Sequence, residues 1–268
     1  MDQFTAQYIE RVVKDLGFTT TSIYKKGKPL HKFGKGLLSN AGDTLVATNE
    51  QYDPDDLVTD YSLSVTDGNP ITHASSTNNS WNPTIKIEGM YQDSDGDLIF
   101  KIQTLTLTGQ TPKALDQALR IVTRVEATNE SLTDDICIYA YDAVELPITA
   151  GEPDEVDAIG MMIDASLADN QSQKAMTGIA ANNAYAVFVV QAHWLAKQSG
   201  SATIKFQVKK TDSVWKTKGE VSCGDGYAGL LTFPTGYIVE PNSLVRLIGS
   251  STSASGIAVA GWCRVNTS

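Results

Sequence analysis

The stretch WNPTIKIEGMYQDSDGDLIFKIQTLTLTGQTPKALDQALRIVTRVEATN, residues 81–129, decides the fold class. Apolar and polar residues alternate in short runs, and two turn sequences separate the runs, DSDGD at 93–97 and LTGQTP at 107–112. Alternation with a period of two puts every second side chain on one face, which is typical of half-buried strands. The stretch therefore predicts antiparallel strands that are joined by tight turns.

The same pattern continues on both sides of this stretch, from residue 44 to residue 265. The expected strands are 44–48, 58–66, 84–90, 98–107, 120–127, 136–141, 184–193, 202–209, 229–233, 244–250 and 257–265. Many short strands without alternating helices predict an antiparallel sandwich or barrel. Composition agrees, because the chain is 41% hydrophobic and only 19% charged, and Thr, Ser, Asn and Gln fill its polar positions. The fold class is mainly β.

One helix is expected, at the N-terminus, where Asp2 can cap its start and Gly17 can end it. Its charged residues Glu10, Arg11 and Lys14 lie opposite an apolar stripe. The stripe consists of Phe4, Tyr8, Ile9, Val12, Val13 and Leu16. A short amphipathic helix must bury such a stripe, either on its own domain or on a neighbouring subunit, and both alternatives stay open.

A basic segment, YKKGKPLHKFGKG at residues 24–36, follows the helix in this acidic protein. Its candidate docking residues are Lys25, Lys26, Lys28, Lys32 and Lys35. The spacing around Lys35 fails the phosphate-loop pattern, since no Ser or Thr follows the lysine. The segment is expected to be a solvated loop, or an electrostatic docking element for an acidic partner surface.

The chain is divided into an N-terminal docking segment, residues 1–40, and a β-sandwich, residues 41–268. Residues 146–160 are a candidate internal joint, because they combine two prolines with four acidic residues. They suit a long connection within one sandwich better than a boundary between two domains, because neither half shows a self-sufficient set of strands.

Charge and cysteine content exclude several classes of protein. The net charge of −10 and the pI near 4.7 argue against nucleic-acid binding, which needs a positive field. The three cysteines are widely spaced and form no CxxC pair, so no metal site, disulfide scaffold or cofactor is expected. The N-terminus is charged throughout and no apolar run could span a membrane. We expect a soluble protein that is made in a cytoplasm.

No constellation of catalytic residues stands out in the sequence. DSDGD resembles a calcium loop, but Gly96 is at its fourth position and Thr104 stands where a bidentate Glu belongs, so a hairpin is expected. None of the three histidines adjoins a nucleophile motif. The neighbouring acidic residues, Asp134-Asp135 and the run 152–157, are interpreted as solvated turns and not as a catalytic carboxylate pair. The tryptophans could stack on sugars, although core or interface packing is their commoner use.

The turns and strands from residue 31 to residue 265 resemble a family of virion structural proteins from tailed phages, notably phages of marine bacteria. The resemblance is carried by HKFG (31–34), TIKIEG (84–89), LTGQTP (107–112), RIVTRVEATN (120–129), GSATIKFQVKK (200–210) and the closing segment 234–265. The family has an LNGTTP-like turn, and this sequence has Thr108 in place of its Asn. PNSLVRL (241–247) also stands where the family often has Thr-Asp-Ile.

This resemblance implies a jelly-roll-like sandwich in a virion, without a catalytic role. The leading expectation is a capsid decoration, cement or head-fibre protein that binds other phage structural proteins, above all the major capsid protein, as a homotrimer. The alternative is a carbohydrate-binding β-sandwich of the tail that recognises the host, with Trp81 or Trp215 stacking on sugar rings. A phage depolymerase is a third hypothesis, which the lack of a carboxylate constellation disfavours.

Overall fold

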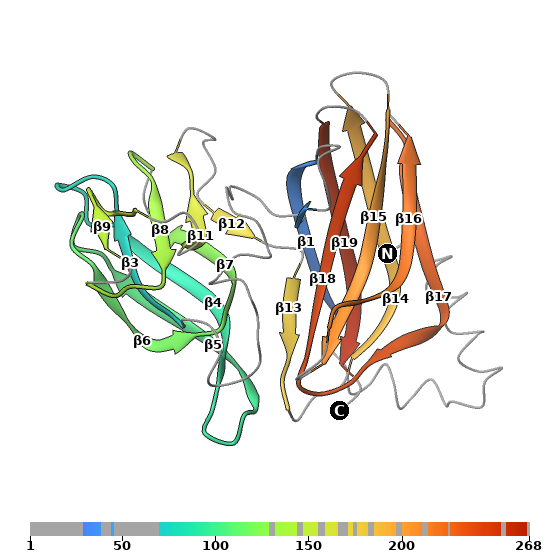
Figure 1. The fold of residues 1–268 in the computed structure, drawn as a ribbon, viewed down its shortest axis with the longest axis horizontal. Helices are drawn as coiled ribbons and strands as arrows, with labels where there is room; N and C mark the ends of the chain where they lie inside the picture. Colours follow the sequence, from blue (N-terminus) through green and yellow to red (C-terminus); the bar gives the residue numbers. More distant parts are fainter. Residues whose placement is uncertain are drawn as a thin grey trace.

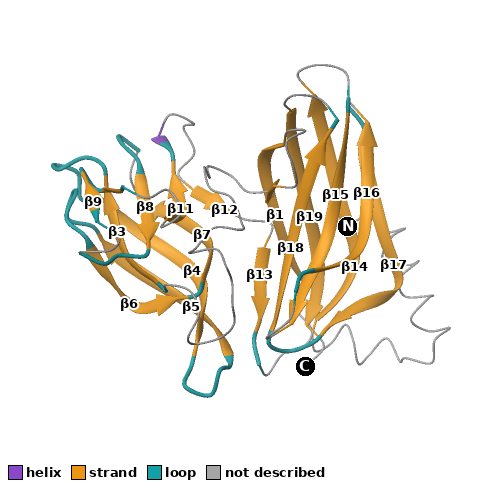
Figure 2. Ribbon diagram, in the orientation of Figure 1, coloured by secondary structure: helices purple, strands orange, loops and turns teal. Residues whose placement is uncertain are grey.

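The computed structural model describes residues 29–38, 44–45, 70–128, 132–143, 147–154, 159–165, 171–173, 176–181, 185–196, 200–210, 214–224, 226–252 and 256–266. Within these ranges every named element is a β-strand, and all paired strands run antiparallel (Figures 1 and 2). The prediction of a mainly β, antiparallel protein is confirmed. The expected helix over residues 2–17 and the expected strand over residues 58–66 lie outside the described residues.

One group of strands forms two facing sheets, here called the first sheet pair, in the order β11-β8-β3-β6 and β12-β7-β4-β5. Its strands are β3 (Ile71–Ser76), β4 (Thr84–Gln92), β5 (Leu98–Thr106), β6 (Lys113–Leu119), β7 (Ile121–Thr128), β8 (Ile136–Tyr139), β11 (Ile159–Ile163) and β12 (Gln171–Gln173). Both sheets contribute to one buried cluster, in which Ile85, Ile87 and Val125 of one sheet meet Ile138 and Met161 of the other. That cluster is the hydrophobic core of the first sheet pair.

The remaining long strands form the second sheet pair, in the order β1-β19-β14-β17 and β13-β18-β15-β16 (Figure 1). Its strands are β1 (Pro29–Leu38), β13 (Met176–Ile179), β14 (Tyr185–Ala196), β15 (Ser201–Lys210), β16 (Lys216–Gly224), β17 (Ala228–Val239), β18 (Ser243–Ser251) and β19 (Gly256–Asn266). Its core joins Leu38 and Val190 of one sheet to Ile204, Phe206 and Leu247 of the other.

The two sheet pairs share one spatial order of strands. The strands β14 to β19 can be matched one by one with β3 to β8, and every pairing within one set then has a counterpart in the other. The short strands β9 and β10, described below, are not part of this comparison. The remaining strands, β1 and β13, then match β11 and β12. They precede β14 in one case and follow β8 in the other. The chain therefore builds the same arrangement twice, starting at a different strand each time.

Two short pieces complete the described structure. β2 (Thr44–Leu45) pairs with β18, and β9 (Ile148–Thr149) pairs with β10 (Glu152–Pro153) beside β8. Residues 147–154, part of the segment considered as a joint, thus lie within the first sheet pair. The chain passes between the sheet pairs elsewhere, after β2 and after β12. Because β1 pairs with β19, the second sheet pair contains both the first and the last described strand, and no single cut in the sequence divides the sheet pairs.

Two segments that were predicted from the sequence to be loops are strands in the structure. β1 pairs with β19 along all ten of its residues, although the segment was expected to be a basic loop. β3 lies between β6 and β8, although His73 was expected in a polar loop. The loop prediction is wrong for residues 29–36 and for His73, for the same reason in both cases, whereas residues 24–28 lie outside the described residues. Backbone N–H and C=O groups pair in a ladder whatever the side chains are, so Lys, Gly, Ser and Thr can occupy a strand when its neighbours supply the apolar surface.

Candidate interaction surfaces

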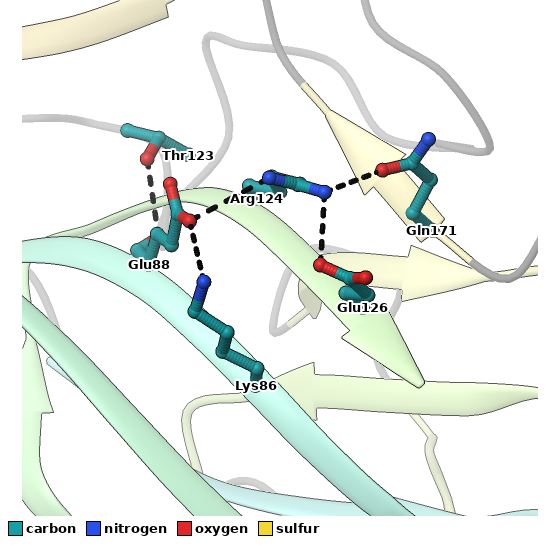
Figure 3. A network of polar contacts seen from close by, with 6 residues as sticks. All are labelled: Lys86, Glu88, Thr123, Arg124, Glu126 and Gln171. Atoms are coloured by element: carbon teal, nitrogen blue, oxygen red, sulfur yellow. Dashed lines mark hydrogen bonds and ion pairs between the residues drawn. The ribbon is translucent and has the colours of Figure 1, made fainter. Parts of the chain in front are cut away.

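A network of charged and amide side chains lies on the outer face of β4, β7 and β12 (Figure 3). The Glu88 carboxylate is 3.4 Å from the Lys86 ammonium and 3.7 Å from an Arg124 guanidinium nitrogen. Arg124 Nη2 also donates to Glu126 Oε2 and to Gln171 Oε1, each at 2.8 Å. These residues sit at alternate positions of their strands, so their side chains emerge on the same side of the sheet.

Two cations balance two anions in this network, and all four side chains remain partly exposed. Such partly exposed pairs stabilise a fold weakly, but the planar guanidinium can hold two acceptors at once. Arg124 thereby ties β12, a strand of three residues, to β7. The network therefore fastens β12 at the edge of the sheet.

An exposed apolar spot lies on β5, at the free edge of the same sheet. Phe100 and Ile102 are 44% and 47% exposed, and the register places Ile102 beside Glu88. On the core side of the same strand, the Gln103 amide donates to Gln117 O at 2.8 Å and accepts from Gln117 N at 2.9 Å. This buried side chain links β5 to the backbone of β6 at the corner between the two sheets.

The DSDGD hairpin is confirmed between β4 and β5. Asp93 Oδ1 accepts from the backbone N–H groups of Asp95 and Asp97, and Gly96 adopts a φ of 85°. Asp97 faces away from the hairpin and accepts a hydrogen bond from the Asn242 amide at 2.6 Å. The aspartate oxygens are thus used in the turn and in a tertiary contact. Within the described residues, no group of three or more His, Cys, Asp or Glu side chains could hold a metal ion.

The junction between the sheet pairs is built at the end of this hairpin. Asn242 Oδ1 accepts from Leu98 N at 3.0 Å, its backbone N–H donates to Ile179 O, and Ala181 N donates to Leu98 O. Behind these bonds, a buried cluster contains residues of both sheet pairs. Met90, Leu98 and Ile121 come from the first and Met176, Leu244 and Ile248 from the second.

β13 packs closely against the first sheet pair at this junction. A Cβ on Gly178 would come within 2.9 Å of the Met90 side chain. Only a residue without a side chain lets the strand approach Met90 so closely. Apolar burial and directed hydrogen bonds together fix how the two sheet pairs meet.

The titratable groups of the described core serve packing. Ser75 Oγ lies 2.9 Å from Tyr139 OH and donates to Gly151 O. Burial raises the pKa of Tyr139 to about 12. His73 contacts the hydroxyl of Thr72 and the edge of the Tyr141 ring, and burial lowers its pKa.

Two thiols of the core are held in the protonated form. Burial raises the pKa of Cys137 far above its ordinary value and also raises that of Cys223. Protonated thiols are poor nucleophiles and poor metal ligands. Their surroundings therefore suit core packing better than chemistry.

Two of the four tryptophans have described side-chain surroundings. Trp81 packs against the core of the first sheet pair, and Trp215 packs against the junction cluster. The Arg246 guanidinium lies 4.0 Å from the centre of the Trp215 ring, as in a cation–π contact. One face of Trp215 is therefore already occupied.

Most of the docking residues expected from the sequence lie outside the described residues. Lys32 and Lys35 are described, and both lie in β1. The exposure of four apolar residues was not expected from the sequence: Phe100, Ile102, Leu230 and Ile238. The signal that could have revealed Phe100 and Ile102 is the run LIFKI (98–102), in which apolar residues occupy both faces of the expected strand.

No protein-family model matches this sequence, and no curated protein matches it. Among the residues that the structure describes, no helix has the length and apolar character needed to cross a membrane.

Proposed function

We propose that this protein is a structural component of a tailed-phage virion, most specifically a capsid decoration, cement or head-fibre protein. It acts as a homo-oligomer, with three copies favoured, and its partners are other phage structural proteins, above all the major capsid protein. It is made in the host cytoplasm and carried in the particle. The proposal includes no catalytic activity, cofactor, nucleic acid or membrane.

The order of strands is the observation that carries the proposal. In the second sheet pair, the chain crosses from one sheet to the other at nearly every connection, giving β1-β19-β14-β17 facing β13-β18-β15-β16. We interpret this order as a jelly roll, and the first sheet pair as the same roll entered at a different strand. Eight-stranded jelly rolls form viral capsid domains and lectin domains. The resemblance of the turn and strand sequences to phage virion proteins favours the capsid role.

A binding experiment with undecorated capsids tests this role. A variant lacking residues 1–28 keeps all of β1, whereas a longer deletion would remove a strand of the second sheet pair. If the N-terminal segment docks on the shell, the deletion abolishes co-sedimentation with capsids. In the full chain, Lys25→Glu/Lys28→Glu weakens binding and makes it less sensitive to salt.

A matched control reverses charge elsewhere. Lys113 and Lys216 are exposed lysines at the starts of β6 and β16. Lys113→Glu/Lys216→Glu changes the net charge by the same amount and should bind capsids like the wild type. Equal binding by all four proteins would remove the docking role from residues 1–28.

The second candidate function is host recognition by a tail-associated, carbohydrate-binding module. It is favoured by the use of jelly rolls in lectins and by the partly exposed Trp81 ring. Binding of the purified protein to host glycans, weakened by Trp81→Ala, would support it over the capsid role. Release of sugar fragments during that assay would instead show a depolymerase and contradict both candidates.

A further inference from the structure

The large apolar side chains that are exposed in the described part of the chain gather at two places. Phe100 and Ile102, which are 44% and 47% exposed, lie on β5. The others lie on or next to β16 and β17, and they are Val214, Tyr227, Leu230 and Ile238. Their exposed fractions range from 54% to 74%. Exposed apolar residues that gather in this way mark interaction surfaces, whereas single ones are normal.

The two places correspond when the strands of the sheet pairs are matched. β5 and β6 meet at one corner of the first sheet pair, here called the first corner. β16 and β17, which match β5 and β6, meet at the second corner. β16 is at the opposite end of its sheet order from the junction strand β13, and Figure 1 shows β16 and β17 on the side of the second sheet pair that faces away from the first. The second corner is therefore accessible when the sheet pairs meet.

Both corners are closed from within by other residues. At the first corner, the Gln103 side chain exchanges two hydrogen bonds with the backbone of Gln117. At the second corner, a Cβ on Gly229 would lie 2.4 Å from the Val221 side chain, so the two sheets touch there. The exposed apolar side chains are not part of either closure. We therefore expect that they can be replaced by polar ones without loss of the fold.

The two sheet pairs also carry opposite charge. Among the described residues between 70 and 173, twelve are acidic and five are basic. Among those between 176 and 252, six are basic and two are acidic. The difference extends to the corners, since Asp95 before β5 and Asp116 on β6 are exposed, and Lys218 of β16 lies 5.7 Å from the centre of the Tyr237 ring. Opposite charges on two surfaces favour their encounter and fix their orientation.

We propose that the first corner of one copy binds the second corner of another copy, so that copies associate head to tail. The two corners combine exposed apolar residues with opposite charge, as the centre and rim of a specific interface do. They do not cover each other within one copy, because the apolar residues of both are exposed in the described structure. A contact between two different surfaces is heterologous, and it closes into a ring when the rotation between copies permits.

This inference rests on the homo-oligomer of the proposed function, because it names the surfaces through which the copies meet. It does not rest on the capsid contact, which is assigned to residues 1–28 and tested with capsids. The experiment below uses the purified full-length protein alone, so either proposal can fail without the other.

Two variants with polar replacements test the contact. Phe100→Ser/Ile102→Thr alters the first corner, and Tyr227→Ser/Leu230→Thr alters the second. Sedimentation equilibrium measures the mass of the assembly as a function of concentration. Each variant should raise the dissociation constant of the contact about tenfold or more, as the loss of central apolar residues from an interface does. Wild-type assembly should also weaken as salt is raised, because salt screens the attraction.

A mixture of the two variants tests the head-to-tail arrangement. The first-corner variant keeps an intact second corner, and the second-corner variant keeps an intact first corner. Together they should form a one-to-one heterodimer and no larger species. Native mass spectrometry resolves this heterodimer when one variant is isotopically labelled.

A matched control alters exposed positions elsewhere. Ala143 and Thr149, which lie near β8 and in β9, are both exposed. Ala143→Ser/Thr149→Ser should assemble like the wild type. Circular dichroism shows whether each variant is folded.

Four results would overturn the proposal. The first is a wild-type protein that stays monomeric at every concentration, and the second is wild-type assembly by both corner variants. The third is loss of assembly in only one of them, which would show a contact between two copies of the same corner. The fourth is the absence of a heterodimer in the mixture at about ten times the concentration at which the wild type is assembled.

Discussion

At the scale of single residues, the turn LTGQTP shows how a close backbone approach restricts the choice of side chain. Gly109 has a φ of 56°, and Thr111 N closes the turn by donating to Thr108 O at 3.1 Å. A Cβ at this position would lie 2.4 Å from the carbonyl oxygen of Asn79. Gly226 also has a positive φ, of 74°, but a Cβ there would meet nothing within 4 Å.

The two glycines provide a matched pair of substitutions. Gly226→Ala should lower the free energy of unfolding by about 1 kcal/mol, the strain of a left-handed alanine. Gly109→Ala should cost distinctly more, about 3 kcal/mol or above, because the backbone around Asn79 must also move. Urea unfolding of both variants measures the difference. Equal losses would mean that the Asn79 contact is easily relaxed.

Tyr139 predicts a pH dependence of stability. Burial raises its pKa from 10.0 to about 12, so the folded protein holds the hydroxyl proton more tightly than the unfolded chain does. The stabilisation is complete below pH 10 and is lost as the pH rises to about 12. It amounts to about 2 to 3 kcal/mol. Tyr139→Phe should therefore lose less stability than the wild type between pH 10 and pH 12.

Urea unfolding at several pH values in this range measures the two curves. Tyr227→Phe, at a side chain that is 74% exposed, is the control and should follow the wild type. Parallel curves for the wild type and Tyr139→Phe would contradict the prediction.

At the scale of elements, some strands were predictable and others were not. The strands β4, β5 and β7 match the expected ranges closely, because apolar residues alternate in them with a period of two. β3 escaped prediction because its buried positions include Ser75 and Ser76. A buried serine is stable only when a partner is present, here Tyr139 and Gly151, and such a partner is invisible in the local sequence.

Side-chain contacts of Arg124 add to the short backbone ladder that attaches β12 to β7. Arg124→Lys keeps the charge but cannot hold Glu126 and Gln171 together, because an ammonium lacks the planar fork. We expect faster hydrogen exchange in residues 171–173 and a loss of global stability below about 1 kcal/mol. Lys86→Gln breaks only the pair with Glu88 and should leave exchange in β12 unchanged. Unaltered exchange in Arg124→Lys would assign the attachment of β12 to its backbone ladder alone.

At the scale of the whole molecule, two sheet pairs with one strand order meet at a small apolar cluster. Leu244 and Leu247 lie on the same strand, β18, and both are fully buried. Leu244 belongs to the junction cluster, whereas Leu247 belongs to the core of the second sheet pair. The two leucines thus separate the contribution of the junction from that of the core.

Each Leu→Ala variant should lose about 2 to 5 kcal/mol. Leu244→Ala should also uncouple the sheet pairs, so that peptides of β4 and β15 lose hydrogen-exchange protection at different urea concentrations. Leu247→Ala should selectively destabilise the second sheet pair. A single transition in Leu244→Ala, shared by both peptides, would show that other contacts couple the sheet pairs.

The sequence by itself determined the mainly β, antiparallel class, the DSDGD hairpin and the core-facing positions of the regular strands. These depend on local alternation and turn chemistry, which neighbouring residues fully encode. Only the tertiary structure decided that β1 pairs with β19 and that the strands divide into two sheet pairs of the same order. It also decided that Asp97 meets Asn242. These features join residues that are far apart in the chain. Pairing between distant segments is not encoded in the local sequence, so it could not be predicted from it.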